Sequence, residues 1–451
     1  MVIPLLSGCL DNGSTYAPPA NFAATPGDGR VTLTWTPNYS IDYWVFTATD
    51  PSLTAFNWID LNNAHAYTIV STPLYLCDLL IGDQYYFAAN GRTSGGPGGS
   101  SSPTVSAAPY DASTRWTVGS TGTTTNLNGV GYTSLMTCFN NPAISGAGTF
   151  AAVGAGGAIY TSADGKSWVN QPAPAGFSSD LYAVTGYTAY LNYQLIAPPW
   201  APIAPQRWVA VGAGGSSVYS TDGITWLVGG SASNQLGTPT TNQNLNAIAQ
   251  VNGIFVAVGD NGTIMFTYDG VSWFKATTPS SIPNLHGVAH GNIFVAVGDN
   301  GTILTSGDGS NWLVPGTPLT PTPVTTNNLR QVAVSTGGII VAVGDQGTIV
   351  TSFNSGGNWT LQPALPGNPN LISVAVENQV FANALANTSL GYIVPSTEFV
   401  AMDSNGNAYN SVDGVNWSGP IITGIPSPSA MVSSGFGYVA AGLGGTTAYA
   451  F

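Results

Sequence analysis

The sequence has 451 residues and a formal net charge of −13, and only 6% of its residues are charged. Seven Lys and Arg residues cannot form a basic stripe, which argues against a nucleic-acid partner and against charge-driven binding to an anionic membrane. Apolar residues make up 43%, enough for two or more domains with their own cores. Two Glu and two Lys are too few for helix surfaces, and an all-β protein is therefore expected.

Residues 1–15 are expected to form an N-terminal tail. Within it, Leu6-Ser7-Gly8-Cys9 resembles the lipobox of bacterial lipoproteins, a family in which the Cys becomes lipidated. Eight residues before Cys9 are fewer than a charged and an apolar signal region need. Two interpretations stay open: Cys9 is a lipidation site, or the tail is an apolar segment that packs on something, such as a neighbouring subunit.

Residues 16–110 are expected to form a sandwich of short strands, beginning with the alternating stretch from Gly29 to Pro37. Trp35 and the pattern Leu79-x-x-Gly82-x-x-Tyr85-x-Phe87 resemble the core Trp and the tyrosine corner of fibronectin type III domains. The resemblance covers this whole segment and implies a spacer or binding adaptor.

Residues 111–451 carry an internal repeat, in which F/W-V-A-V-G is followed by a strand and then by Asp-Gly-x-x-Trp. The Trp residues that end six units are 58, 47, 39, 47 and 58 residues apart, a period typical of four-stranded propeller blades. The C-terminal stretch lacks its Trp strand, whereas the strand around Trp116 has nothing before it. Their pairing predicts a seven-bladed β-propeller closed by both ends of the domain.

The turn before each Trp resembles the Asp-box of sialidase-like and photosystem-assembly-factor-like propellers. An acidic side chain is expected to cap the turn, a Gly to adopt positive φ, and the Trp to pack between blades. Because the motif recurs in nearly every blade, we interpret it as architectural, not catalytic. The residues concerned are Asp164, Asp222, Asp269, Asp308, Asn354 and Asp413, with Trp116, Trp168, Trp226, Trp273, Trp312, Trp359 and Trp417.

A second set of turns is expected on the opposite face of the propeller. These turns contain Asp260, Asp299, Asp345 and Asp403. Two interpretations stay open: a weakly acidic funnel that binds a cation or a sugar, or tight hairpin turns without a ligand. Apart from these residues and Asp180, the propeller has few groups for hydrolysis, with Glu377 and Glu398 as its only Glu. The propeller's Arg115, Arg207 and Arg330, and the scattered His65, His286 and His290, predict neither a sialidase site nor a metal site.

Long non-repeated loops in blades one, two and six are expected to carry function, because repeat proteins place binding sites there. In blade two, Tyr187, Tyr190, Tyr193 and Trp200 are candidate interface residues; alternatively they cover the junction between the domains. These loops are expected on the same face of the propeller as the Asp-box turns, and this face is expected to receive the first domain or a partner. A disulfide between Cys77 and Cys138 is a further hypothesis, consistent with export.

These features favour a non-enzymatic scaffold or binding protein, extracellular or on the outer cell surface, and a candidate subunit of a surface filament or layer. Its expected partners are other proteins or copies of itself, with glycans as a further class and with a membrane only through a lipid anchor. No cofactor is expected. The alternative is a carbohydrate-binding or glycoside-hydrolase-like propeller, because fold alone does not choose between these functions.

Overall fold

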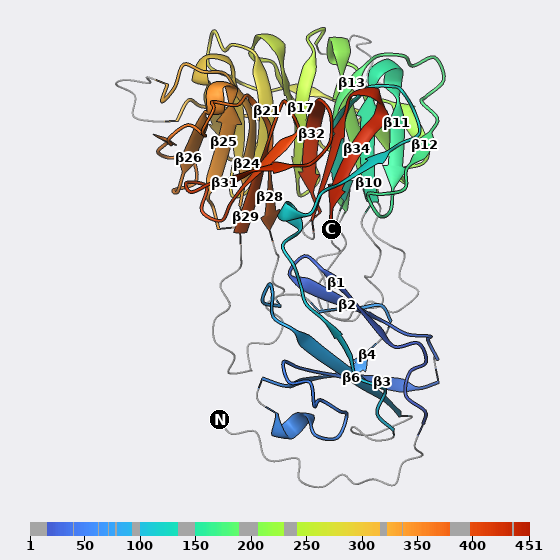
Figure 1. Cartoon of the computed structure of the whole chain (residues 1–451). Coiled ribbons are helices and arrows are strands. Elements are labelled where there is room, and N and C mark those ends of the chain that lie inside the picture. Colours follow the sequence, from blue (N-terminus) through green and yellow to red (C-terminus); the bar gives the residue numbers. More distant parts are fainter. Residues whose placement is uncertain are drawn as a thin grey trace. The chain divides into compact units, whose positions relative to one another are not determined.

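The computed structural model describes residues 16–38, 40–61, 63–70, 72–76, 79–92, 100–133, 149–188, 206–229, 241–315, 323–335, 337–378, 397–434 and 437–451. These residues form strands and short 3-10 turns, with no α-helix among them, which confirms the all-β class. None of the described helical turns is long or apolar enough to span a bilayer. Two compact units are present (Figure 1), and the chain passes between them after Ala112, compared with the expected residue 110.

The first unit consists of two antiparallel sheets around one core. One sheet has the strand order β1 (Ala23–Gly27), β2 (Arg30–Thr34), β5 (Leu74–Leu76), and the other has the order β4 (His65–Val70), β3 (Asp42–Ala48), β6 (Tyr85–Arg92), β7 (Val105–Ala107). Trp35 is buried between the sheets and packs edge-on against Tyr43, with ring centroids 5.8 Å apart. The Tyr85 hydroxyl accepts a hydrogen bond of 3.0 Å from the Leu80 main chain, which fixes the corner before β6. A 3-10 turn, η1 (Trp58–Asp60), covers a smaller cluster around Phe46.

The second unit is a β-propeller with seven blades within the described residues. From the axis outwards, blade one is formed by β9 (Leu127–Thr133), β10 (Thr149–Gly154), β11 (Ile159–Ser162) and β12 (Val169–Gln171). Blade two is formed by β13 (Leu181–Thr188), β14 (Gln206–Gly212), β15 (Ser217–Ser220) and β16 (Trp226–Val228). Blade three is formed by β17 (Leu245–Val251), β18 (Ile254–Gly259), β19 (Ile264–Thr267) and β20 (Phe274–Lys275). Blade four has β21 (Leu285–His290), β22 (Phe294–Gly298) and β23 (Ile303–Ser306), and a bridge from Thr305 to Leu313 stands for its outer strand.

Blades five to seven repeat the same arrangement. Blade five is formed by β24 (Leu329–Val334), β25 (Ile340–Gly344), β26 (Ile349–Ser352) and β27 (Thr360–Leu361). Blade six is formed by β28 (Leu371–Asn378), β29 (Thr397–Asp403), β30 (Asn407–Ser411) and β31 (Ser418–Ile422). Blade seven is formed by β32 (Pro428–Ser433), β33 (Tyr438–Gly442), β34 (Thr446–Ala450) and β8 (Thr117–Ser120). The innermost strands of successive blades lie side by side, and β32 neighbours β9, which closes the ring.

Blade seven is built from both ends of this unit, as the sequence predicts. β8, which follows Trp116, pairs antiparallel with β34, and Thr117 lies opposite Tyr449. The side chains of Tyr438 and Trp116 also pack together in this blade, with ring centroids 6.3 Å apart. The ring therefore cannot unzip from a free blade.

The core of the propeller lies between the blades. In the second strand of blade three, Phe255 to Val258 are completely buried, and Val256 packs with Phe294 and Trp312 of blade four. Two neighbouring blades approach each such strand from its two sides, which explains why it is apolar throughout and contains Ala at its middle. The repeated V-A-V-G stretch is thus a packing element.

Candidate functional site

On one face of the propeller, a turn joins the second and third strands of each blade. In six blades this turn is a 3-10 segment: η3 (Ala155–Gly157), η4 (Ala213–Gly215), η5 (Asp260–Gly262), η6 (Asp299–Gly301), η7 (Asp345–Gly347) and η8 (Leu443–Gly445). Its middle residue has positive φ, such as 52° at Asn261 and 57° at Gln346. Asn and Gly tolerate this conformation best, and a Gly or Asn occupies the position in all of these turns except the one with Gln346.

Each of these turns is bonded to its own blade and to the next one. In blade three the Asp260 N–H donates to the Asn244 carbonyl (3.0 Å), and the following N–H, of Asn261, donates to the side chain of Asn284 in blade four (2.9 Å). The same interblade bond recurs around the ring. Its acceptors are Asn126, Asp180, Asn244, Asn284, Asn328 and Asn370.

This hydrogen-bonded ring was not predicted from the sequence, although the sequence contains a signal for it. Each acceptor is followed by Leu, so that Asn-Leu or Asp-Leu precedes the innermost strand of six blades. At the remaining junction, before blade seven, Ser427 stands in this position. The dipeptide lies outside the V-A-V-G and Asp-box segments on which the repeat was defined.

A β-bulge follows this position in every blade. The innermost strand has one more residue than its partner at this point; for example, Leu285 pairs with Gly298 and Gly287 with Val297, which leaves His286 unpaired. Bulges redirect side chains and are common beside functional sites. The seven bulged residues are Asn128, Tyr182, Asn246, His286, Arg330, Ile372 and Ser429.

The seven bulged side chains comprise six residue types, with Asn in two blades, although the backbone around them repeats. A repeated backbone that presents different side chains around one axis is a suitable arrangement for specific recognition. We call these seven residues the bulge ring.

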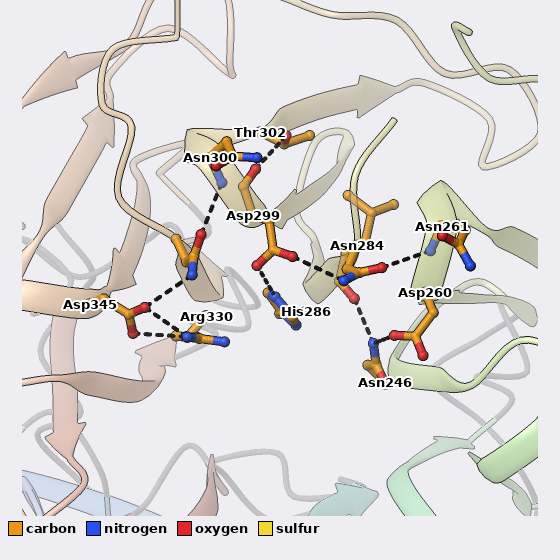
Figure 2. Close-up of polar contacts among 12 residues, drawn as sticks. Asn246, Asp260, Asn261, Asn284, His286, Asp299, Asn300, Thr302, Arg330 and Asp345 are labelled. Carbon is orange, nitrogen blue, oxygen red and sulfur yellow. Dashed lines mark hydrogen bonds and ion pairs between the residues drawn. The ribbon is translucent and has the colours of Figure 1, made fainter. Parts of the chain in front are cut away.

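Blades three to five give the bulge ring its most polar part, shown in Figure 2. Asn246 donates to Asp260 (2.9 Å), His286 Nε2 lies 2.6 Å from Asp299, and Arg330 donates to Asp345 through Nε (2.8 Å) and Nη2 (2.7 Å). Each carboxylate also accepts a bond from the Asn that begins its own blade. We call these three pairs, Asn246–Asp260, His286–Asp299 and Arg330–Asp345, the polar sector.

The charges of the polar sector support one another. The hydrogen bonds from Arg330 hold the pKa of Asp345 below its usual range, although burial acts in the opposite direction, and Asp345 in turn raises the pKa of Arg330. About a third of the Arg330 side chain and a quarter of the Asp345 side chain remain exposed. A guanidinium has five N–H groups, so Arg330 keeps donors for a ligand while it remains paired.

The sequence-predicted turn residues do not form one open acidic funnel. Asp260, Asp299 and Asp345 lie in adjacent blades, and their carboxylates are engaged by donors of their own blades. Asp403 is buried and accepts bonds from the Asn405 and Asn407 main chains and from Tyr409, whose pKa is raised to about 12 by burial and by this carboxylate. In the corresponding turns of blades one, two and seven, Ala or Leu replaces the Asp.

The Asp-box residues occupy turns between the third and fourth strands. In blade two, Asp222 accepts bonds from the Ile224 and Thr225 main chains (2.8 and 2.7 Å), and Ser220 donates to it (2.9 Å). The same pattern holds at Asp164, Asp269, Asp308 and Asp413, and Asn354 keeps the Ser352 and Asn358 bonds in its longer turn.

The seven Trp residues occupy the same position in their repeat units, but their indole N–H groups do not all make the same hydrogen bond. The indoles of Trp226, Trp312, Trp359 and Trp417 donate to the carbonyl three residues earlier, and Trp116 donates in the same way to Ser113. Trp273 instead donates to Ser217, and the Trp168 indole N–H has no partner among the described residues. The packing of these rings therefore matters more for the architecture than a single shared bond.

The Asp-boxes should make the free energy of unfolding fall at acidic pH. Burial alone would raise the pKa of Asp413, but bonds from the Asn416 main chain and side chain and from Val415 outweigh it and hold that pKa at about 2. Hydrogen bonds from Asn311 likewise keep the pKa of Asp308 well below its usual range. A lowered folded-state pKa stabilises the fold above the unfolded value of 3.8, and this contribution is lost as the pH falls towards 2.

Urea unfolding measured between about pH 6 and about pH 2 checks this expectation, with Asp308→Asn as the comparison. The wild-type free energy of unfolding should fall below pH 4, and the variant should be less stable at neutral pH but lose less in acid. Equal acid losses in both proteins would show that Asp308 does not contribute.

Several predicted residues lie outside the described part of the chain: Cys9, Cys77, Cys138, Tyr190, Tyr193 and Trp200. Tyr187 is described, and it lies half-buried against the core between blades two and three. Among the described residues, no group of three or more His, Cys, Asp or Glu side chains could hold a metal ion. His290 packs on the ring of Phe294, and burial lowers its pKa.

No family model matches the sequence, and no curated protein matches it. Solved structures do. "YCF48 bound to D1 peptide" is 16% identical, covers 74% of this chain and 94% of that chain, and has a TM-score of 0.51. YCF48 from Cyanidioschyzon merolae is 14% identical, with coverages of 74% and 98% and a TM-score of 0.50. Virginiamycin B lyase from Staphylococcus aureus is 10% identical, with coverages of 74% and 99% and a TM-score of 0.51.

These likenesses show that the chain has a β-propeller fold, in agreement with the ring of blades described above. One of the similar structures holds a peptide and another is a lyase, according to their descriptions. At this level of identity the fold is shared, and the site has to be judged from its own residues.

Proposed function

We propose that this chain is a non-enzymatic scaffold of the outer cell surface, whose propeller recognises an extended peptide segment of another protein at the polar sector. The observation that carries the proposal is the bulge ring: a fixed backbone presents side chains of six residue types in seven blades, and in blades three to five the bulged side chain is paired with the Asp of the adjacent turn. Exposed N–H donors of Arg330 beside engaged carboxylates suit a peptide main chain, which offers both acceptors and donors.

Three further observations support this proposal. The structure of YCF48 with a D1 peptide is an example of a similar propeller that holds a peptide. A sequence with 6% charged residues and many polar neutral ones is typical of exported proteins. The strand orders of the first unit, three strands facing four, support a fibronectin type III-like adaptor that would hold the propeller away from its anchor.

The test uses the full chain on an array of immobilised random heptapeptides, with a glycan array beside it. The variants are His286→Ala/Arg330→Ala and, separately, Tyr182→Ser, because the Tyr182 side chain makes no hydrogen bond within the described residues and its loss should leave the turns intact. The control is Tyr268→Ser/Val412→Ser, which removes exposed side chains from the Asp-box turns.

We expect peptide binding by the wild type and the control, and a loss of about tenfold or more in affinity for the double variant, as for other well-placed recognition residues. Equal thermal midpoints would show that the variants are folded. Peptide binding that survives in the double variant, or binding to glycans alone, would contradict the proposal, whereas Tyr182→Ser, in blade two outside the polar sector, should keep its binding.

The second candidate function is carbohydrate binding or glycoside hydrolysis, and one observation favours it. Glu377 and Glu398, the only glutamates of the chain, lie directly opposite each other in β28 and β29. Opposed side chains are separated by about the 5 Å that retaining glycosidases use between their carboxyl groups. However, Glu377 is 3% exposed, and Glu398 accepts bonds from Ser113 (2.9 Å) and Tyr438 (3.1 Å), so we place this function second.

A further inference from the structure

The outer rim of the propeller carries an exposed apolar residue in every blade. Their exposed fractions range from 48% for Val118 and Leu361 to 82% for Ile422. We call these residues the rim belt: Val118, Val169, Leu227, Phe274, Leu313, Leu361 and Ile422.

Six residues of the rim belt lie on outermost strands, and Leu313 lies in the bridged outer segment of blade four. Just after β20, Thr277 is bonded to Ser310 and Trp312 of blade four, whereas the outer strands themselves have no further described strand paired with them. Soluble proteins usually protect such edges with charged side chains, because an unprotected edge pairs with other strands. Lys275 is the only charged residue in the described outer strands of all seven blades. The rim thus lacks protection by charge, although its outer strands are only two to five residues long.

On the arc of blades two to four, the rim presents five exposed apolar residues. Leu227 is followed by the exposed Val228, Leu313 by the exposed Val314, and Phe274 lies between them on β20. Phe274 also packs against Phe266, whose ring lies 5.5 Å away, and this contact holds the exposed ring in place. Patches of this kind on a soluble domain mark interaction surfaces.

We infer that this arc is a self-association surface, on which the β20 edge of one copy pairs antiparallel with the β20 edge of a second copy. A partner with a charged edge would bury its charges against an almost uncharged rim, whereas a second copy brings an edge of the same neutral composition. Two-fold symmetric pairing centred on Phe274 places the two Phe274 rings opposite each other, a stabilising cross-strand pair.

The same pairing determines how far apart the Lys275 residues of the two copies lie. Lys275 of one copy then lies diagonally from Lys275 of the other, at roughly 7–8 Å between backbone positions. Lys275 is exposed, so both ammonium groups keep their water. Because similar edges lie around the whole ring, further copies could add at other blades and form a layer or a filament.

This inference gives the proposed scaffold a second copy of itself as partner, and in that sense it rests on the proposed function. The two can fail separately, because self-association is measured without a peptide and involves the rim, whereas the peptide array tests the polar sector. Variants of the rim should keep wild-type peptide binding.

The experiment is sedimentation velocity of the full chain over about 1 to 100 μM, a range that detects weak and moderate association. The rim variant is Leu227→Lys/Phe274→Lys/Leu313→Lys. The control, Ile224→Lys/Val412→Lys/Leu443→Lys, adds the same charge at exposed apolar positions outside the outer strands. We expect the wild type and the control to associate equally, and the rim variant to associate at least about tenfold more weakly.

A wild type that stays monomeric throughout this range, or a control that dissociates as much as the rim variant, would overturn the inference. A second measurement needs no variant, because Lys166 and Lys275 are the only lysines. A short amine-reactive cross-linker should join Lys275 of one copy to Lys275 of another in mixed isotope-labelled and unlabelled protein. Intermolecular cross-links that avoid Lys275 would also overturn it.

Discussion

Replacing Gly259 by Ala should destabilise the propeller by about 3 kcal/mol or more, the upper range for overpacking a tightly packed site. Gly259 ends the second strand of blade three, and a Cβ there would collide with the carbonyl oxygen of Asn244. That carbonyl is the acceptor for the Asp260 N–H, and the Asn244 side chain accepts the bond from the preceding blade. The substitution would therefore disturb the bulge, the turn and an interblade link together.

The matched control is Gly307→Ala, because a Cβ at Gly307 would have no neighbour within 4 Å and its φ is not in the left-handed region. This change should alter the free energy of unfolding by less than about 0.5 kcal/mol, or raise it slightly by restricting the unfolded chain. Urea unfolding of the three proteins compares them. Similar losses of unfolding free energy for the two variants would show that the close approach of the Asn244 carbonyl does not prevent a side chain at position 259.

Truncating Trp208 to Ala should cost about 3–5 kcal/mol, the usual loss for a large buried aromatic side chain. Trp208 is completely buried between blades one and two, where it packs with Ala151, Val184 and Trp226. The cavity would lie in the middle of an interblade core that close-packed strands cannot easily fill.

Trp208→Phe should behave differently and be neutral or stabilising. The Trp208 indole N–H is buried and has no hydrogen-bond partner among the described residues, so its removal relieves an unsatisfied donor. Phe already occupies the corresponding place in blades one, three, four and six, as Phe150, Phe255, Phe294 and Phe399. Thermal and urea unfolding measure both variants, and a loss above about 2 kcal/mol for Trp208→Phe would contradict this account of the site.

The propeller could be predicted from sequence because its signals are local and repeated. Asp269 and Trp273 form one turn and its packing within five residues, and the same spacing recurs along the chain. The closing strand near Trp116 was predictable because the incomplete C-terminal unit required it, and β8 does pair with β34.

The polar sector was harder to predict because its pairs depend on register. His286 and Asp299 are 13 residues apart, and only the bulge at His286 turns that side chain towards the turn of its own blade. A bulge leaves no pattern in hydrophobic alternation that distinguishes it from an ordinary strand residue. The sequence therefore indicated the acidic turns but not the side chains that pair with Asp299 and Asp345.

We expect peptide recognition by this propeller to take place at the polar sector on the bulge ring. Hydrogen–deuterium exchange of the full chain, with and without a peptide selected from the heptapeptide array, tests it most directly. The account predicts slower exchange at η5, η6 and η7 and at the bulges of β17, β21 and β24 when the peptide is bound. Protection confined to the Asp-box turns or to the first unit, with these segments unchanged, would contradict it.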